Sequence, residues 1–273
     1  MNAARRASAA LPVAALFALA APVLAGIAWM GWAGSPESYR IINAAALALA
    51  TLWLVFARQP ATLWHWRYIG MASVAVLCLP FVTGPAVNTV SRWVALGPLA
   101  LNSGALAVPT LVVAAARDSK WGPYLLGAAL VPLSFQPDAA AGLALTFAAA
   151  GMHDRTKAWR YGLVCVLGFA LTISMALRGE LPPQMFVERV LIDAARGGLL
   201  WLLVLMLALI ASFFTILKGL RTPPATAYAL AGALFGFFTM ALVSHYPAPF
   251  VGYGAAPILG FGLALGLAEG KRR

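Results

Sequence analysis

The residues of this sequence that could take part in chemistry lie in short polar stretches between long apolar runs. The stretch SFQPDAAAG places the carboxylate of Asp138 between two such runs. An ionisable group in apolar surroundings is by default a candidate for function. The structural alternative is that the carboxylate accepts hydrogen bonds from the first amides of a helix that begins at Ala139.

A second polar stretch, GPAVNTVSRWVALGPLALN at 84–102, contains Asn88 and Arg92. A guanidinium can bind phosphate with two parallel hydrogen bonds, so this stretch is a candidate anion site. The alternative is an arginine that extends its charged end to the membrane surface beside an interfacial Trp93.

A third stretch, at 178–197, carries most of the remaining charge outside the basic loops. Past Pro183, a helix would place Arg189, Asp193 and Arg196 on one face, where the aspartate would form structural ion pairs. Such a helix would lie in the membrane interface and lead into an apolar run that begins at 198. Glu188 has no basic residue four positions away on either side, so it is the better candidate for a catalytic acid or base.

The last polar stretch, HYPAPFVGYGAAPILG at 245–260, contains two prolines that exclude an ordinary helix interior. Glycines flank Tyr253 on both sides and allow close approach of other backbone segments. Irregular backbone at membrane depth persists only where protein or water satisfies its polar groups. We therefore expect a re-entrant segment that lines a cavity.

The elements that must position these residues are membrane-spanning helices. Hydrophobic residues make up 62% of the 273 residues and charged residues 10%, too few for the surface of a soluble domain. The apolar runs are continuous, whereas a barrel requires alternation. The sequence predicts an all-α polytopic membrane protein, a single transmembrane domain over 1–273. Its ten apolar runs lie near 11–33, 41–57, 68–84, 103–116, 123–134, 138–152, 160–177, 198–217, 226–244 and 250–268.

Several of these runs are shorter than the roughly 20 residues of a full span. The two that meet at Asp138 form either a half-buried hairpin or one long helix broken at Pro137. Proline disfavours helical geometry in the residue before it, which favours the hairpin.

The distribution of charge gives the orientation. With the N-terminus inside, 14 of the 19 basic residues fall in inner segments and 5 in outer ones. This asymmetry agrees with the positive-inside rule and places both termini in the cytoplasm. The five outer acidic residues balance the outer basic ones, so the net charge of +11 belongs to the cytoplasmic face. Such a charge fits an anionic membrane and does not require nucleic acid as a partner.

Other classes of function lack support. Cys78 and Cys165 lie in different apolar runs, and the three histidines are dispersed, which argues against a disulfide framework or a metal site. The sequence contains no nucleotide-binding glycine loop, and we expect no cofactor. The first 25 residues have features of a signal peptide, but the apolar run continues through Trp29 and Trp32, which favours a first span.

Three polar stretches, in this order, resemble motifs of the SEDS family (shape, elongation, division and sporulation). Residues 84–97 are similar to the family pattern G-x-x-x-N-x-x-x-R-W-x-x-x-G, QPD at 136–138 matches its Gln-Pro-Asp, and 247–259 is similar to its P-L-P-F-[IV]-S-Y-G-G-S-S-L-L. The resemblance covers roughly residues 40–268. It implies ten spans in the bacterial inner membrane and polymerisation of lipid II, a polyprenyl-diphosphate-linked disaccharide. It also implies a single-span class B penicillin-binding protein as the partner.

The sequence departs from the family pattern at three places. One is the last motif, where the family's Ser-Tyr-Gly-Gly-Ser-Ser is Gly-Tyr-Gly-Ala-Ala-Pro here. Where the family has Glu and Lys after the Arg-Trp motif, Gly104 and Ala107 stand here. The family's catalytic Asp lies in a large loop, which here is about twenty residues long, and an ungapped alignment places Val187 at that position. A shift of one residue in the alignment brings Glu188 to the position of the catalytic Asp. The resemblance then implies that Glu188 is the base that acts on the acceptor sugar hydroxyl and that Arg92 lies near the diphosphate.

Three interpretations follow from the resemblance and its departures. The first is a compact glycosyltransferase with Glu188 as the catalytic residue and with Arg92, Asn88, Asp138 and Tyr253 binding substrate. The second is a degenerate relative that binds lipid or acts as a scaffold in wall synthesis. The third is a transporter or flippase of a polyprenyl-linked substrate, although the internal repeats typical of transporters are absent.

Overall fold

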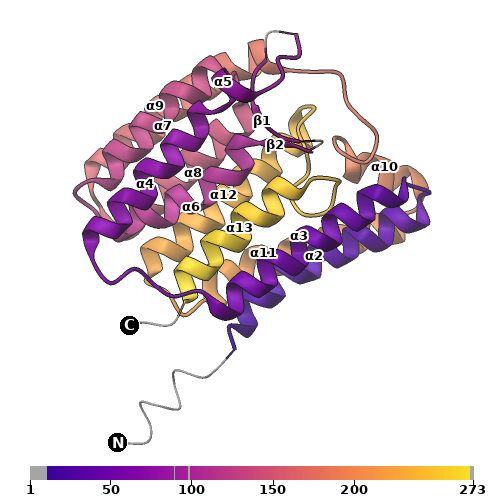
Figure 1. Cartoon of the computed structure of the whole chain (residues 1–273), viewed down its shortest axis with the longest axis horizontal. Helices are drawn as coiled ribbons and strands as arrows, with labels where there is room; N and C mark the ends of the chain where they lie inside the picture. The colour runs from indigo at the N-terminus through magenta and orange to yellow at the C-terminus, as the bar shows by residue number, and fades with distance from the viewer. Residues whose placement is uncertain (1–10, 89, 98, 271–273) are drawn as a thin grey trace, which may run out of the picture.

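The computed structural model describes residues 11–88, 90–97 and 99–270 of the chain. Helices dominate, and Figure 1 shows them aligned as one bundle. Their bounds are α2 Val13–Trp32, α3 Glu37–Phe56, α4 Leu63–Cys78, α5 Pro80–Thr83, α6 Ser103–Arg117, α7 Gly122–Phe135, α8 Ala139–Thr156, α9 Trp159–Gly179, α10 Val190–Gly197, α11 Leu199–Phe214 with a π-helical end η1 Thr215–Gly219, α12 Pro224–Val243 and α13 Ala255–Glu269.

The predicted apolar runs coincide with these helices, from α2 for the first run to α13 for the last. Six helices are long and apolar enough to cross a membrane, the third being α4 continued through α5. Helices α6, α7 and α13 are apolar but shorter, and α8 has 18 residues. The prediction of an all-α polytopic membrane protein with some short helices is confirmed.

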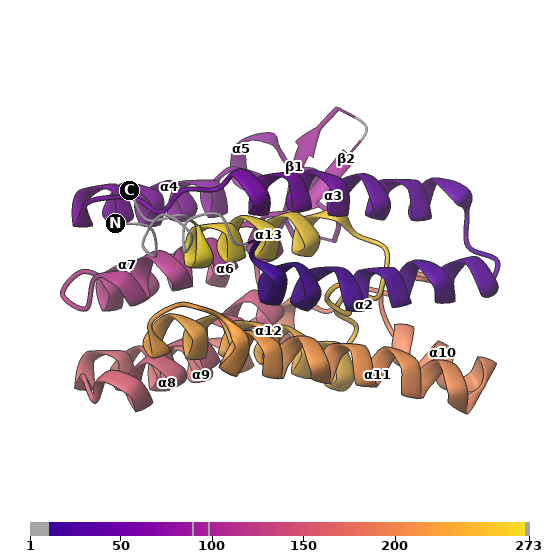
Figure 2. The same ribbon diagram turned by 90° about the horizontal axis from the view of Figure 1, so that it is seen from below.

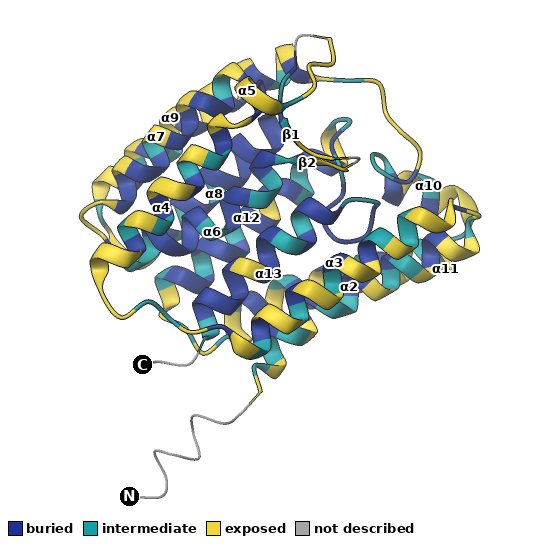
Figure 3. Ribbon diagram, in the orientation of Figure 1, coloured by how far each residue is buried: buried dark blue, intermediate teal, exposed yellow. Residues whose placement is uncertain are grey.

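The helices are arranged in three layers (Figure 2). One outer layer holds α3 and α4, the middle layer α2, α6, α7 and α13, and the third α8, α9, α11 and α12. Burial is greatest in α6, α8, α12 and α13, whereas α3, α4, α9 and α11 present exposed apolar side chains at the periphery (Figure 3). The exposed faces are therefore suited to lipid.

Small residues allow the central helices to approach closely. Helix α12 packs its Gly232 and Gly236 against the backbone of α8, where a Cβ atom at either position would overlap α8 main-chain atoms. Gly260 of α13 packs against α6 in the same way. Close contact through small residues is the usual means of helix association in membranes, because apolar burial from water is not available there.

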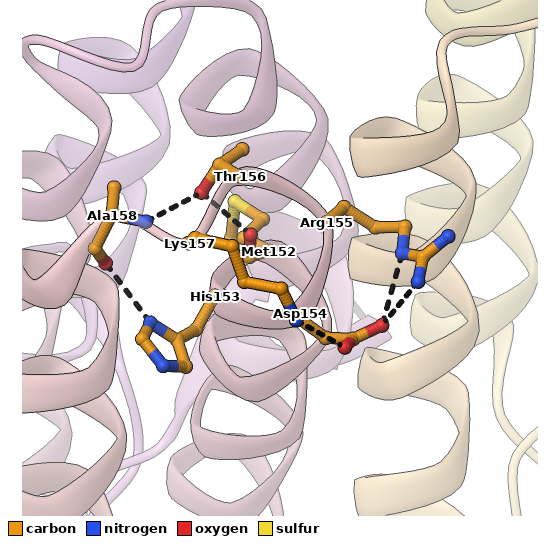
Figure 4. A network of polar contacts seen from close by, with 7 residues as sticks. All are labelled: Met152, His153, Asp154, Arg155, Thr156, Lys157 and Ala158. Atoms are coloured by element: carbon orange, nitrogen blue, oxygen red, sulfur yellow. Dashed lines mark hydrogen bonds and ion pairs between the residues drawn. The ribbon is translucent and has the colours of Figure 1, made fainter.

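The end of the bundle at which α2 begins and α13 ends corresponds to the predicted inner face (Figure 1). It carries the turns between α3 and α4, α6 and α7, α8 and α9, and η1 and α12. Arg67 pairs with Asp118 at 2.6 Å. At the end of α8, Asp154 bonds both Arg155 and Lys157 (Figure 4). The described basic residues of the predicted cytoplasmic collar thus lie at one end; Arg5, Arg6, Lys271, Arg272 and Arg273 lie outside the described residues.

The connections at the opposite, outer end are more elaborate than the sequence indicates. Between α5 and α6 the chain forms a hairpin of β1 (Trp93–Leu96) and β2 (Leu99–Asn102), paired antiparallel from Trp93↔Asn102 to Leu96↔Leu99. Its β-structure was not predicted, because the run lacks regular alternation of polar and apolar residues.

The interfacial helix, which the sequence predicts past Pro183, is shorter than expected. Helix α10 begins at Val190, because Arg189 adopts a left-handed conformation with φ of 59° and cannot be helical. The predicted stacking of three charges on one face is therefore wrong for Arg189. Asp193 still pairs with Arg196, at 3.5 Å.

Candidate functional site

The candidate site lies at the outer end of the bundle, where three connections meet. These are the segment before β1, the connection 180–189 between α9 and α10, and the segment 244–254 between α12 and α13. Glu188 and Pro247 form an antiparallel β-bridge that joins the last two connections directly. Figure 1 shows this region beside β1, β2 and α10.

Arg92 is the buried cation of this region, with 4% of its surface exposed. Its guanidinium lies over the rings of Trp93 and Tyr246, at 5.1 and 4.9 Å from their centroids. One terminal nitrogen, Nη2, donates a hydrogen bond of 2.9 Å to the carbonyl of Gly179, whereas the buried Nη1 has no partner. Within the described ranges Arg92 forms no ion pair. A buried guanidinium with an unused donor can bind an anion.

Glu188 lies half-buried in the 180–189 connection, and its Oε2 accepts a hydrogen bond of 2.8 Å from the backbone amide of Gln184. Burial raises the pKa of this carboxyl above its ordinary value. The amide of Gln184 and the charges of Arg92 and His245 act in the opposite direction and reduce that rise. Because its pKa is raised, this carboxylate is a stronger base than an exposed glutamate, and the positive charge of Arg92 lies near it.

His245 adds a second link between the connections. Its Nδ1 lies 3.1 Å from Oε1 of Glu180, which also accepts a hydrogen bond from Ser244 at 3.2 Å. These contacts attach the end of α12 to the segment that follows α9. The segment on which Glu188 is carried is thereby held at both ends.

The Gln-Pro-Asp junction separates α7 from α8, which pack side by side as the predicted hairpin. Asp138 is 1% exposed; its Oδ1 accepts a hydrogen bond from the amide of Ala141 at 3.1 Å, and its Oδ2 accepts one from Asn102 at 3.0 Å. The carboxylate therefore caps α8, as the structural alternative predicted. Gln136 is likewise engaged, since it accepts a hydrogen bond from Ser103 and donates one to the carbonyl of Leu77.

Tyr246 connects this junction to Arg92. Its hydroxyl lies 3.2 Å from the amide of Ala139 and 3.5 Å from the carbonyl of Pro137, while Arg92 packs on its ring. The helix start that Asp138 caps is thus linked to Arg92 through Tyr246, whereas the carboxylate oxygens of Asp138 themselves accept hydrogen bonds from Asn102 and Ala141.

The other two candidates lie at the edges of the region. Asn88 is exposed and adopts a left-handed conformation (φ of 47°) in a tight turn in which Val87 and Val90 exchange backbone hydrogen bonds. Such turns favour asparagine, so its conformation has a structural reason. Tyr253 stacks on Tyr39 of α3 with ring centroids 3.8 Å apart, and its amide donates to the carbonyl of Phe186.

Segment 244–254 is irregular and buried, as predicted for re-entrant backbone: Tyr246, Ala248, Phe250 and Val251 are each at most 3% exposed. Asn43, a fully buried residue of α3, holds it in place. Its side chain donates to the carbonyl of Gly252 at 2.9 Å and accepts from the amide of Gly254 at 3.1 Å. The sequence analysis missed Asn43; the available signal was a lone amide inside an apolar run.

Asn102 was missed as well. It caps α6 by accepting a hydrogen bond from the amide of Ala105, and it donates to Asp138, so it joins the starts of α6 and α8. Gly104, which replaces the glutamate of the SEDS motif, lies in this contact. A Cβ atom there would be 2.5 Å from the Cβ of Ala141 and 2.9 Å from Oδ2 of Asp138. The space for a longer side chain is therefore closed.

In the part of the chain that the structure describes, no three His, Cys, Asp or Glu side chains gather in a way that could hold a metal ion. The geometry instead provides a buried cation, a half-buried carboxylate and aromatic walls at the outer end of a helical bundle. The class of protein is accordingly a polytopic membrane protein with a polar site at one face.

Comparison with solved structures identifies the fold as that of SEDS proteins. The structure is similar to the rod shape determining protein RodA of Thermus thermophilus, with a TM-score of 0.69, 20% sequence identity, and coverage of 93% of this chain and 94% of that one. An aspartate-to-alanine mutant of the same protein gives a TM-score of 0.68 at 21% identity, covering 93% and 95%. A chain of a peptidoglycan synthase complex that coordinates polymerization and crosslinking gives 0.65 at 20% identity, covering 94% and 97%.

No family model matches the sequence, and no curated protein is similar to it by sequence. The resemblance predicted from three short motifs is confirmed at the level of the fold.

Proposed function

We propose that this chain takes part in peptidoglycan synthesis in the bacterial inner membrane, binds a polyprenyl-diphosphate-linked sugar such as lipid II at its outer end, and extends glycan chains there. The observation that carries the proposal is the buried guanidinium of Arg92, with its unpartnered Nη1, close enough to Glu188 to affect the pKa of that carboxyl. The shared fold with RodA and the peptidoglycan synthase chain supports the same conclusion.

In the proposed reaction, an acceptor sugar hydroxyl attacks the anomeric carbon of the donor. Glu188 takes the hydroxyl proton as the new carbon–oxygen bond forms. The bond between the anomeric carbon and the diphosphate oxygen breaks, and polyprenyl diphosphate leaves. Arg92 would stabilise the negative charge on the leaving diphosphate, because a charge-assisted bond to guanidinium is strongest in a site from which water is excluded.

The remaining candidates would then have lesser roles. Tyr253 and Asn88 lie at the edges of the region, where they would contact the sugar. Asp138 would act indirectly, since its oxygens already bond Ala141 and Asn102.

One observation favours a second candidate function, a binding or scaffold protein without catalysis. The close packing of Gly104 on Asp138 and Ala141 leaves no room for the second acidic side chain of the SEDS motif. A protein that keeps the cation but lacks that group would still bind the lipid diphosphate. In either case we propose a single-span class B penicillin-binding protein as the partner; one similar structure comes from a peptidoglycan synthase complex.

The test is polymerisation of lipid II by the purified protein together with a candidate class B penicillin-binding protein. Glu188→Gln removes the base while keeping its size, and Asp193→Asn is the matched control, an outer aspartate on α10. Glycan chains that are lost in Glu188→Gln and retained in Asp193→Asn would support the glycosyltransferase. If no variant forms glycan chains, but the protein binds lipid II saturably and Arg92→Lys weakens this binding, the result would support a binding protein without catalysis. Absence of both activities would refute the proposal.

A further inference from the structure

A second polar feature of the outer end lies away from the candidate site, on the lipid-facing side between α2 and α3. An open cavity of about 410 Å³ is formed there by the last turns of α2 and the first turns of α3. Two charged residues of α3, Glu37 and Arg40, line it together with Gly31 of α2. Trp32, at the end of α2, is 56% exposed and marks the level of the membrane–water boundary.

The guanidinium of Arg40 is only partly satisfied. Its Nε atom is buried and has no hydrogen-bond partner. Its Nη1 and Cδ would lie 3.5 and 3.6 Å from a Cβ atom at Gly31, so the side chain extends across the surface of α2 and into the cavity. Within the described ranges Arg40 has no ion pair, not even with Glu37 one helical turn before it.

The cavity therefore contains a cation and an anion that face the same space without neutralising each other. A ligand that carries both a negative and a positive group would pair with both, and neither charge would then lack a partner. The deeper wall is apolar and consists of Ile27 and Ala28 on α2 and Ile41 and Ala44 on α3. These residues lie up to a turn further from the surface than Gly31 and Arg40, at the depth of acyl chains.

We propose that this cavity binds one phospholipid of the outer leaflet with a primary-amine headgroup, that is, a phosphatidylethanolamine. Its phosphate binds the guanidinium of Arg40, its ammonium binds the carboxylate of Glu37, and an acyl chain lies along Ile27 and Ala44. This site is distinct from the one proposed for the lipid-linked sugar, which is formed by Arg92 and Glu188. The lipid would fill the seam between α2 and α3 next to Tyr39, which stacks on Tyr253 of the buried segment.

Native mass spectrometry of the purified full chain tests this proposal with phosphatidylethanolamine, phosphatidylglycerol and phosphatidylcholine as probes. We expect phosphatidylethanolamine to be retained most strongly, and Arg40→Gln to lower its retention by about tenfold, the loss of one charge-assisted contact. Glu37→Gln should abolish the preference over phosphatidylglycerol. Gly31→Leu leaves both charges in place but fills the cavity, and should displace the lipid as well.

The matched control is Arg178→Gln, which removes a different outer arginine, an exposed one that bonds backbone carbonyls of α7 and α9. Thermal unfolding of each variant verifies that the fold is kept. Equal retention of the three lipids, retention unchanged in Arg40→Gln, or an equal loss in Arg178→Gln would overturn the proposal. Inorganic phosphate is a further probe in the unfolding measurement. If phosphate alone protected the protein as well as phosphatidylethanolamine does, the site would bind a free anion, and the lipid proposal would be overturned.

Discussion

Replacing Asn43 by alanine should detach segment 244–254 from α3. The substitution removes two hydrogen bonds, one to the carbonyl of Gly252 and one from the amide of Gly254. Gly252 is buried, so its carbonyl would be left without a partner at a cost of about 1–3 kcal/mol. Gly254 is partly exposed, so water can replace its bond and the loss is about 0.5–1.5 kcal/mol. Together the two losses amount to about 1.5–4.5 kcal/mol.

Hydrogen exchange of peptides covering 248–256 would measure this change directly. A loss of this size raises the open population of the segment by about 10- to 1,600-fold, since each 1.4 kcal/mol is a factor of ten. Asn43→Asp is a second informative variant, because it keeps the acceptor for Gly254 but places an anion against the carbonyl of Gly252. It should open the segment at least as much.

Ser73→Ala is the matched control, since the buried Ser73 bonds only the carbonyl of Ile69 within its own helix. It should leave exchange of the segment unchanged. If Asn43→Ala behaved like Ser73→Ala, the argument that Asn43 holds the segment would be refuted.

Three further outcomes are expected. If Glu188 is the base, polymerisation will fall as pH drops through its pKa, and burial places that inflection above the range of an exposed glutamate, as a pH–rate profile would show. Gly179→Ala should destabilise the protein by about 1–3 kcal/mol in denaturant titration, because its Cβ would overlap the carbonyl of Pro137. Arg67→Ala should lower the free energy of unfolding by about 3 kcal/mol, because it leaves the carboxylate of Asp118 buried without its partner.

The last of these outcomes also has a defined pH dependence. Burial raises the pKa of Asp118, but hydrogen bonds from Arg67 and from the amides of Trp121 and Lys120 outweigh it and lower the pKa overall. A carboxyl with a lowered folded-state pKa contributes stability above its unfolded pKa and loses it as pH falls through the folded value. The difference in stability between wild type and Arg67→Ala should thus shrink in acid; a constant difference would contradict the assignment.

The bundle could be predicted from sequence because each helix corresponds to one continuous apolar run, and charged residues, proline or glycine mark the ends of that run. The asymmetric distribution of basic residues gave the orientation of the helices, and this orientation placed the polar connections that contain the motifs at one face. The hairpin β1–β2 and the late start of α10 could not be predicted in this way. The first depends on pairing between strands, and the second on the left-handed conformation of Arg189, which the pattern of charges does not encode.

For the site, sequence indicated the residue types but not their partners. Asp138 and Arg92 were both identified as unusual ionisable groups, yet the structure gives them different surroundings. Asp138 is bonded to Asn102 and Ala141, whereas Arg92 keeps a donor without a partner. Asn43 was missed because its two partners lie more than 200 positions away along the chain. Contacts of that separation depend on the folded arrangement.

Helix α13 is buried around nearly its whole circumference, yet it follows all the other described helices in the chain. It packs against α3 and α6, which the ribosome makes much earlier. During synthesis these earlier helices can enter the bilayer, but the space between them has to be held by lipid or by looser packing until α13 arrives. The insertion of α13 is therefore the step that expels lipid from the space between α3 and α6.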